Sequence, residues 1–265
     1  MKDQLTSSEL LIEAVRQPGR IMQAYTAFYG QYSIGNCLLA LSQCLQRKLA
    51  PGPLATFMRW KALGRHVKKD EKALTLCMPV SAKTKIVNPK TRQEEERVRT
   101  YFVHRTNWFV LAQTEGGEFH LSIPGFDIEK ALQVLDVKRV EFDLMNGNVQ
   151  GFARDRSVAI NPVAQLPSKT TFHEIAHILL GHTSEETLVD EESTPRNIRE
   201  VEAEGVALIC LEALGIEGAE FCRGYLKHWL GDRQEIPAIS CQKILTAASL
   251  IIKAGQVELT DTANG

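Results

Sequence analysis

Residues 170–182 read TTFHEIAHILLGH and contain the pattern His-Glu-x-x-His, which constrains the chain more than any other feature of its sequence. On a helix, His173 and His177 lie one turn apart and share a face, so both imidazoles can reach one metal ion while Glu174 lies beside it. The pattern occurs by chance in roughly one in a hundred chains of this length, so a chance match on a packed helix is the alternative. A metal centre needs a third ligand from elsewhere in the chain.

In the metzincin arrangement, His-Glu-x-x-His-x-x-Gly-x-x-His, a glycine lies three residues and a third histidine six residues after the second histidine. Gly181 and His182 fall four and five residues after His177, so the register does not fit. We therefore expect His182 to be a residue at the C-terminal end of the helix, stabilised there by the helix dipole, rather than a ligand.

The third ligand is predicted to be Glu200, in the segment REVEAEGVALICLEALG. Glu200 opens the pattern Glu-x-x-Ala-x-x-x-Ala, whose small residues let one helix approach another closely. Glu204 follows one turn later and is expected to accept a hydrogen bond from a ligand histidine, whereas Glu202 should point elsewhere. Two histidines, one glutamate and an open position form the ligand set of catalytic zinc. We predict one Zn²⁺ per chain, held by His173, His177 and Glu200.

This ligand set predicts a zinc-dependent metallopeptidase whose protein substrate the sequence does not identify. Zinc lowers the pKa of its water to ~7, and Glu174 is the predicted general base that takes the proton and passes it to the leaving amine. The stretch GFARDRSVAINP before the motif is predicted to be a strand, which can pair with an extended peptide or be an ordinary sheet strand. For stabilising an oxyanion, Tyr225 and His228 are candidates only.

Charge divides the chain into two halves of opposite sign. Residues 1–112 hold 18 Lys and Arg against 8 Asp and Glu, or +10, while the remainder holds 13 against 24, or −11. Residues 47–105 alone hold 15 basic and 5 acidic residues, interleaved with Phe57, Trp60, Tyr101, Trp108 and Phe109. Cations that follow phosphates and rings that stack on bases suit single-stranded nucleic acid. The alternatives are a solvated basic face and, for Trp108 and Phe109 above all, core aromatics.

The hydrophobic periodicity predicts an α+β protein with two domains. Predicted helices cover residues 8–15, 21–29, 34–48, 54–63, 128–135, 168–182, 196–214, 219–230 and 238–254, and predicted strands cover 73–80, 101–112, 139–144, 150–153 and 157–161. The polar stretch 83–99 is predicted to be a hairpin excursion or mobile loop, and 115–117 a turn. No apolar run suits a membrane span, the start MKDQLTSSELL is charged, and the six cysteines form no C-x-x-C pair. We therefore expect a cytoplasmic protein with reduced cysteines and no membrane partner.

Several stretches together resemble ArdC-type antirestriction proteins over nearly the whole chain. FYGQYSIGNCLLALSQ, FMRWKALGRHVKKDEKALTLCMPV and FVLAQTEGG resemble the N-terminal domain of that family, and HEIAHILLGH with REVEAEGVA resembles its zincin-like C-terminal domain. The resemblance implies a plasmid- or phage-associated protein that binds single-stranded DNA through residues 1–125. It also implies a gluzincin-type, thermolysin-like metallopeptidase domain over residues 126–265.

The resemblance also implies which residues serve each function. His173, Glu174, His177 and Glu200 match the metal centre of the family. The DNA-binding pieces are matched by Tyr32, Asn36, Trp60, Arg65, Lys68, Lys69 and Lys72. One position departs from the family, because Asp70 stands where a glycine is usual and adds a negative charge to the basic turn.

We therefore expect an ArdC-like antirestriction protein that protects mobile-element DNA from host restriction. One alternative is a regulatory metallopeptidase similar to the ImmA/IrrE group, which cleaves repressors. Another is a pure DNA-shielding module with a vestigial zinc site. The intact Glu174 argues against a vestigial site, since a structural metal needs no general base.

Overall fold

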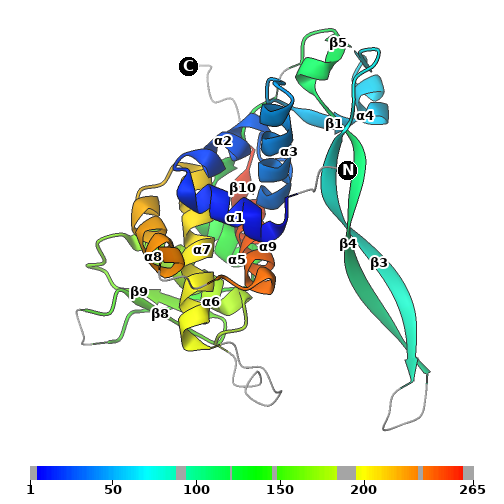
Figure 1. The fold of residues 1–265 in the computed structure, drawn as a ribbon. Helices are drawn as coiled ribbons and strands as arrows, with labels where there is room; N and C mark the ends of the chain where they lie inside the picture. Colours follow the sequence, from blue (N-terminus) through cyan, green and yellow to red (C-terminus); the bar gives the residue numbers. More distant parts are fainter. Residues whose placement is uncertain are drawn as a thin grey trace. The chain divides into compact units, whose positions relative to one another are not determined.

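The computed structural model describes residues 5–87, 94–119, 121–144, 148–183, 195–231 and 235–258 (Figure 1). The chain mixes helices with short strands and forms two compact units. The first unit consists of Met1–Leu38 and His120–Gly265, and the second of Leu39–Phe119. This division differs from the predicted boundary after residue 125, because the first two helices belong with the C-terminal half. Among the described helices, none is long and apolar enough to cross a membrane.

The first unit is built around one buried helix, α7 (Arg196–Leu214), in which every residue from Val201 to Ala213 is buried. The helices α2 (Arg20–Ala27), α6 (Pro167–Leu179), α8 (Ala219–Gly231) and α9 (Ala238–Gly255) pack against it (Figure 1). The helix α1 (Ser7–Arg16) packs on α8 and α9, and α5 (Ile128–Val134) on α9. The run from Val206 to Leu214, apolar apart from Glu212, explains this central position, because a helix that is apolar on nearly all sides is stable only when it is surrounded.

A buried ion pair ties the N-terminal helices to the C-terminal half. Glu212 of α7 pairs with Arg223 of α8 and accepts a hydrogen bond of 3.0 Å from the backbone N–H of Ile21 at the start of α2. The Arg223 guanidinium also donates to the carbonyl oxygens of Ala14 and Val15, at 2.6 and 2.7 Å. Removing either charged partner would leave the other buried and uncompensated, so α1 and α2 are integral to this unit.

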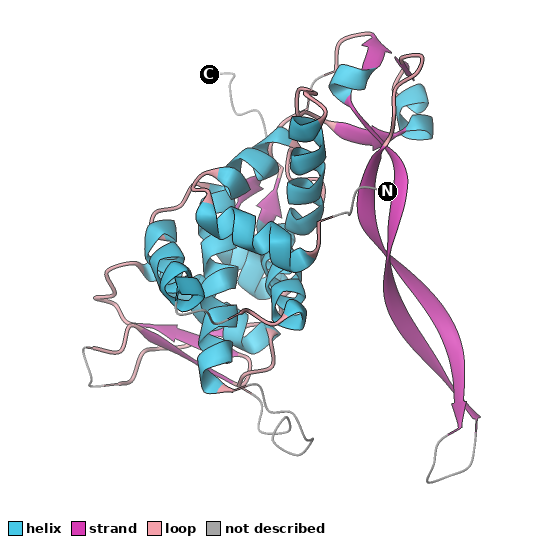
Figure 2. Ribbon diagram, viewed as in Figure 1, coloured by secondary structure: helices cyan, strands magenta, loops and turns pink. Residues whose placement is uncertain are grey.

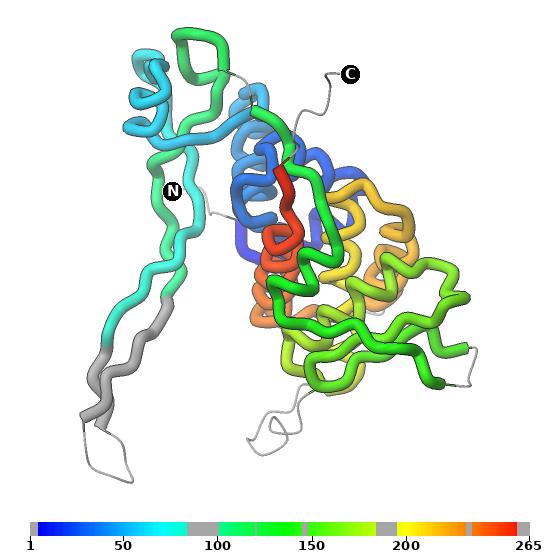
Figure 3. Tube along the Cα trace, turned by 180° about the vertical axis from the view of Figure 1, so that it is seen from behind, coloured from blue at the N-terminus to red at the C-terminus, as the bar shows by residue number. Residues whose placement is uncertain are grey.

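Two small sheets complete the first unit. The strands β7 (Lys138–Arg139), β9 (Ser157–Ile160) and β8 (Gly151–Arg154) form a sheet in the order β7-β9-β8, and α6 packs on β8 and β9. The strand β7 is shorter than the predicted strand at 139–144. The strands β6 (Gly125–Phe126) and β10 (Gln256–Val257) pair antiparallel (Figure 3). A Cβ on Gly151 would lie 2.6 Å from the Thr170 methyl carbon, so a side chain there would push β8 away from α6.

The second unit carries a long antiparallel ribbon (Figure 2). Its strands are β3 (Leu74–Val87) and β4 (Glu94–Val110), and β1 (Leu54–Thr56) pairs with the end of β4. The polar stretch 83–99 therefore belongs largely to paired strands, while residues 88–93 lie outside the described part. The unit also contains the end of α3 (Ile34–Gln46), α4 (Phe57–Ala62), the 3-10 turn η1 (Leu111–Gln113), and a two-stranded sheet of β2 (Arg65–Val67) and β5 (Thr114–Gly116).

Two local predictions in this unit are wrong. Residues 54–63 do not form one helix, because the first three pair with β4 and Thr56 then caps α4 by accepting a hydrogen bond from the Arg59 backbone N–H. The segment at 115–117 is not only a turn, because Glu115 and Gly116 pair with β2.

Candidate functional site

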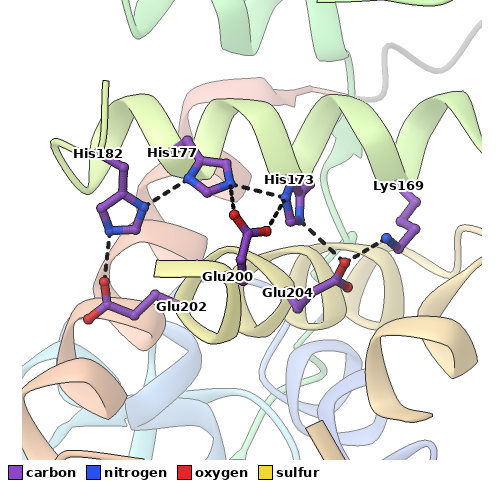
Figure 4. A network of polar contacts seen from close by, with 7 residues as sticks. All are labelled: Lys169, His173, His177, His182, Glu200, Glu202 and Glu204. Atoms are coloured by element: carbon purple, nitrogen blue, oxygen red, sulfur yellow. Dashed lines mark hydrogen bonds and ion pairs between the residues drawn. The ribbon is translucent and has the colours of Figure 1, made fainter. Parts of the chain in front are cut away.

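His173 and His177 face Glu200 across the contact between α6 and α7 (Figure 4). The two histidine Nε2 atoms lie 3.0 Å apart. The Glu200 oxygens lie 3.4 Å from Nε2 of His173 and 3.8 Å from Nε2 of His177. The structure thus brings the three predicted ligands together, with one ligand atom from each within 4.8 Å of the others.

The geometry of this cluster fits a divalent cation. Zinc with ligand bonds of ~2.0–2.1 Å in a tetrahedral site separates its ligand atoms by about 3.3 Å. The observed separations of 3.0, 3.4 and 3.8 Å, of which the last two go to different oxygens of Glu200, lie on either side of that value. Two imidazole nitrogens and a carboxylate oxygen are ligands that zinc prefers. The Glu200 side chain is 40% exposed, whereas those of His173 and His177 are 15% and 14% exposed. The centre is therefore open to solvent on the Glu200 side, where a further ligand can enter.

Glu204 lies beside His173, at ion-pair distance. Its Oε1 lies 3.4 Å from Nδ1 of His173 and accepts a hydrogen bond of 2.7 Å from Nζ of Lys169 (Figure 4). Burial alone would raise the pKa of Glu204, but hydrogen bonds from His173, Cys222 and Lys169 outweigh it and lower this pKa to about 2. Glu204 is consequently a carboxylate at neutral pH, and it directs the Nδ1–H of His173 away from the cluster.

In the absence of metal, the two histidines differ in proton affinity. Burial lowers the pKa of His173, but Glu200 and Glu204 outweigh it and raise this pKa to about 9. Burial and the positive charge of His173 lower the pKa of His177 to about 4. In the metal-free protein at neutral pH, His173 is therefore protonated and positively charged, whereas His177 is neutral.

Glu174 follows His173 directly on the helix α6, and its side chain is buried. Its pKa is raised, chiefly by burial, and the charge of His173 offsets part of this rise. A carboxylate of raised basicity beside the ligands suits the predicted role of a general base. Tyr225 and His228 both lie on α8, and the pKa of Tyr225 is raised by burial and then by the charges of Glu200 and Glu204.

The end of α6 carries a contact that the sequence does not predict. Gly181 adopts φ 74°, and the backbone N–H of His182 donates to the carbonyl oxygen of His177 at 2.8 Å, as in a Schellman motif. His182 thus ends the helix and is not one of the three clustered ligands. Its ring nonetheless reaches back, with Nδ1 at 2.9 Å from Nδ1 of His177 and Nε2 at 2.9 Å from Oε2 of Glu202 (Figure 4). Glu202 therefore points away from the three clustered ligands, as expected, and contacts His182 instead.

The residues that the resemblance assigns to DNA binding fall into two groups. Trp60 is fully buried, donates its indole N–H to the Phe109 carbonyl at 2.8 Å and packs edge-on against Phe119. Trp60 is therefore a core residue and is not available to stack on a base, and Asn36 is also buried. Tyr32 is half-buried, and Trp108 belongs to the core as favoured above.

The basic turn between β2 and β3 remains exposed. Lys69 and Lys72 are exposed, whereas Lys68 is exposed but donates to the Ala112 carbonyl at 2.9 Å. Arg65 donates to Thr114 and Gly117, so it joins β2 to β5. Asp70 adopts φ 67°, the left-handed conformation that glycine adopts without strain and Asp tolerates. This backbone conformation accounts for the glycine that is usual at this position in the resembled family.

A family model agrees with the resemblance in the N-terminal part of the chain. Residues 14–109 match the family model of the N-terminal domain of anti-restriction factor ArdC. The crystal structure of the antirestriction ArdC protein from the R388 plasmid in its metal-free form aligns with 84% of this chain and 84% of its own, at 16% identity and a TM-score of 0.43. Its Mn(II)-bound structure aligns with 88% of this chain and 97% of its own, at 17% identity and a TM-score of 0.39. No curated protein matches the chain. By the family model, residues 14–109 of the chain form a domain of the ArdC N-terminal type.

Proposed function

We propose that the chain is a zinc-dependent metallopeptidase within an ArdC-type antirestriction protein, with His173, His177 and Glu200 as its metal ligands. The observation that supports this proposal most directly is the convergence of two imidazole nitrogens and one carboxylate beside the buried Glu174. A divalent ion held there supplies Lewis acidity and stabilises the charge that develops on a peptide oxygen.

The surrounding residues have distinct tasks in this proposal. Glu174 removes a proton from the attacking water and delivers it to the leaving amine, and its raised pKa favours the uptake step. Glu204 holds the ring of His173 in the orientation that presents Nε2. The strand β8 is the edge of its sheet and packs beside α6, so its backbone is placed to pair with an extended peptide. Tyr225 on α8, whose pKa responds to the charge of Glu200, is the candidate for stabilising the oxyanion.

The test compares metal content with hydrolysis of casein in zinc-loaded full-length protein. Glu200→Ala should lose most of the metal, because it removes one of three ligands. Glu174→Gln should retain the metal and the fold but lose hydrolysis, because Glu174 is not a ligand. Glu220→Ala, at an exposed glutamate on α8, is the matched control and should change neither. Equal metal content in the Glu200→Ala and control proteins would reject Glu200 as the third ligand, and a wild type that hydrolyses nothing would reject the peptidase.

We further propose that the second unit binds single-stranded DNA. The second unit, residues 39–119, holds 15 Lys and Arg against 7 Asp and Glu, or +8. With Trp60 in the core, the exposed rings are Phe57, Tyr101 and Phe102, which are 49%, 47% and 51% exposed. Tyr101 pairs with Val80 and Phe102 with Pro79, so the last two present their rings on opposite faces of the ribbon. Rings on a ribbon rich in lysine and arginine supply both stacking and charge.

DNA binding is tested with the full chain by fluorescence anisotropy on an oligothymidine and on a duplex of equal length. The single strand should bind more tightly, and affinity should fall steeply with salt as counterions are released. Lys69→Ala with Lys72→Ala should reduce both the affinity and its salt dependence. Failure to bind either DNA at low salt would remove this proposal and leave the metal centre untouched.

The two activities can be separated by protection of incoming plasmid DNA from restriction in cells. If Glu174→Gln protects as well as wild type and Lys68→Ala with Lys69→Ala does not, DNA shielding is the operative mechanism, which we favour. The reverse result makes proteolysis primary. A wild type that gives no protection would favour a regulatory peptidase similar to the ImmA/IrrE group.

A further inference from the structure

The ligand His177 is backed by a second polar chain that leads away from the metal centre into the core. His177 Nδ1 contacts His182 Nδ1, and His182 Nε2 contacts Glu202, with both separations at 2.9 Å. The His182 side chain is 5% exposed and that of Glu202 is 0% exposed. A chain of buried polar groups between α6 and α7 is costly unless every contact in it is a hydrogen bond, so the protons must be ordered along it.

The order of those protons follows from the chemistry of the three groups. Glu202 as a carboxylate can only accept, so His182 must donate through its Nε2–H. Neutral His182 then has a lone pair on Nδ1, which accepts a hydrogen bond from the Nδ1–H of His177. With its proton on Nδ1, neutral His177 has its lone pair on Nε2, the atom that lies 3.0 Å from Nε2 of His173 and 3.8 Å from Glu200. Each link therefore sets the tautomer of the next.

The position of Glu202 is otherwise difficult to explain. It lies in the fully buried stretch of α7, where an unpaired carboxylate would be strongly unfavourable. Its described contacts are His182, a hydrogen bond with Ser240 and the Nζ of Lys243 at 4.0 Å. Ser240 and Lys243 support the carboxylate from α9, and only His182 connects it to the metal centre.

We propose that His182 and Glu202 are positioning residues for the metal centre: Glu202 fixes the tautomer of His182, and His182 holds the Nε2 lone pair of His177 toward the ligand cluster. This inference rests on the proposed metal centre. Glu204 performs the corresponding task for His173 directly, whereas for His177 the task is divided between two residues because the left-handed turn at Gly181 brings His182 between ligand and carboxylate. The spacing that excludes His182 as a third metal ligand thus places it against Nδ1 of the second ligand, His177.

The experiment measures zinc affinity of the full chain by competition with a chromophoric chelator, for wild type, His182→Phe, Glu202→Gln and the double variant. Loss of such a supporting partner costs about 10–100-fold in metal affinity. We expect a loss in this range for His182→Phe. The double variant should bind no more weakly than His182→Phe alone, because Glu202 acts through His182. The visible spectrum of the Co(II)-substituted protein should change in both single variants, which a loss of stability alone would not produce.

Glu212→Gln is the matched control, because Glu212 is also a buried glutamate of α7 but pairs with Arg223. It should lower the melting temperature without changing zinc affinity or the Co(II) spectrum of the folded protein. If His182→Phe does not fold, Glu202→Gln and Ser240→Ala keep the His182 ring and still test its hydrogen bonds. Glu202→Gln should weaken zinc affinity, and Ser240→Ala should weaken it less. Wild-type zinc affinity in the folded single variants would overturn the inference alone. A wild type that binds no zinc would overturn the metal centre and this inference together.

Discussion

Zinc affinity of this protein should depend on pH above neutrality, where an ordinary histidine site has already levelled off. The metal-free centre keeps a proton on His173, whose pKa is raised to about 9, while His177, with a pKa of about 4, is already neutral. Metal binding must displace the proton on His173 and no other over this interval. Affinity should therefore rise about tenfold for each pH unit between about pH 5 and pH 9.

The interval from pH 7 to pH 8.5 separates this expectation from the usual case. With one displaced proton of pKa about 9, zinc affinity should increase about 25-fold across it. A site limited by a histidine of ordinary pKa, ~6.5, would gain only about 1.3-fold. The sign follows from protonation: raising the pH removes the competing proton, so binding strengthens as pH rises and levels off above the raised pKa.

The assay is chelator competition at constant ionic strength, with proton release measured by calorimetry in buffers of different ionisation enthalpy. Glu204→Gln removes one of the three carboxylates that raise the pKa of His173, so its affinity should level off at a lower pH than in wild type. Glu220→Gln, at an exposed glutamate, should follow the wild type. A change of less than twofold between pH 7 and pH 8.5 in wild type would refute the reasoning.

The candidate metal centre could be predicted largely from sequence because its geometry is local or helical. The spacing of His173 and His177 on one helix face, and the carboxylate at the start of the next long helix, are set by helix periodicity. The role of His182 could not be predicted in the same way. It depends on a left-handed residue that reverses the chain at Gly181, and on which face of α7 meets the end of α6. The sequence patterns HExxHxxxGH (173–182) and ExExE (200–204) were the only signals that His182 and Glu202 lie near the metal centre.

The fold was less predictable where pairing between distant segments overrides local pattern. Residues 54–63 have helical spacing, yet Leu54 pairs with Val110 because β4 offers a free edge. Trp60 lies among lysines and arginines, which suggested a stacking ring, but its indole N–H finds the Phe109 carbonyl inside the unit. The ion pair of Glu212 with Arg223 joins segments that no local pattern relates, so the grouping of residues 1–38 with the C-terminal half was not foreseeable.

Three further outcomes are expected. In metal-free protein the raised pKa of His173 stabilises the fold below about pH 6.5, and this contribution disappears as pH rises through about 9, while the lowered pKa of His177 offsets part of it at pH 6. Urea denaturation with chelator present should therefore show a loss of about 2 kcal/mol between pH 6 and pH 9.5, and equal stability at both would contradict it. Tyr101→Ala and Phe102→Ala should each weaken oligothymidine binding by about 1–3 kcal/mol, measured by anisotropy, with little change in melting temperature because both rings are half exposed. Asp70→Gly should strengthen DNA binding about threefold at low salt, because it removes a charge that repels a phosphate at about 6 Å by about 0.7 kcal/mol in water. Its control is Asp155→Gly, since Asp155 has a similar left-handed backbone, with φ 52° against 67° for Asp70, so the two substitutions change backbone strain alike and only the first changes charge at the basic turn. Equal effects of the two glycine substitutions on DNA affinity would show that the loss of one negative charge anywhere in the chain, not repulsion at the basic turn, governs the change.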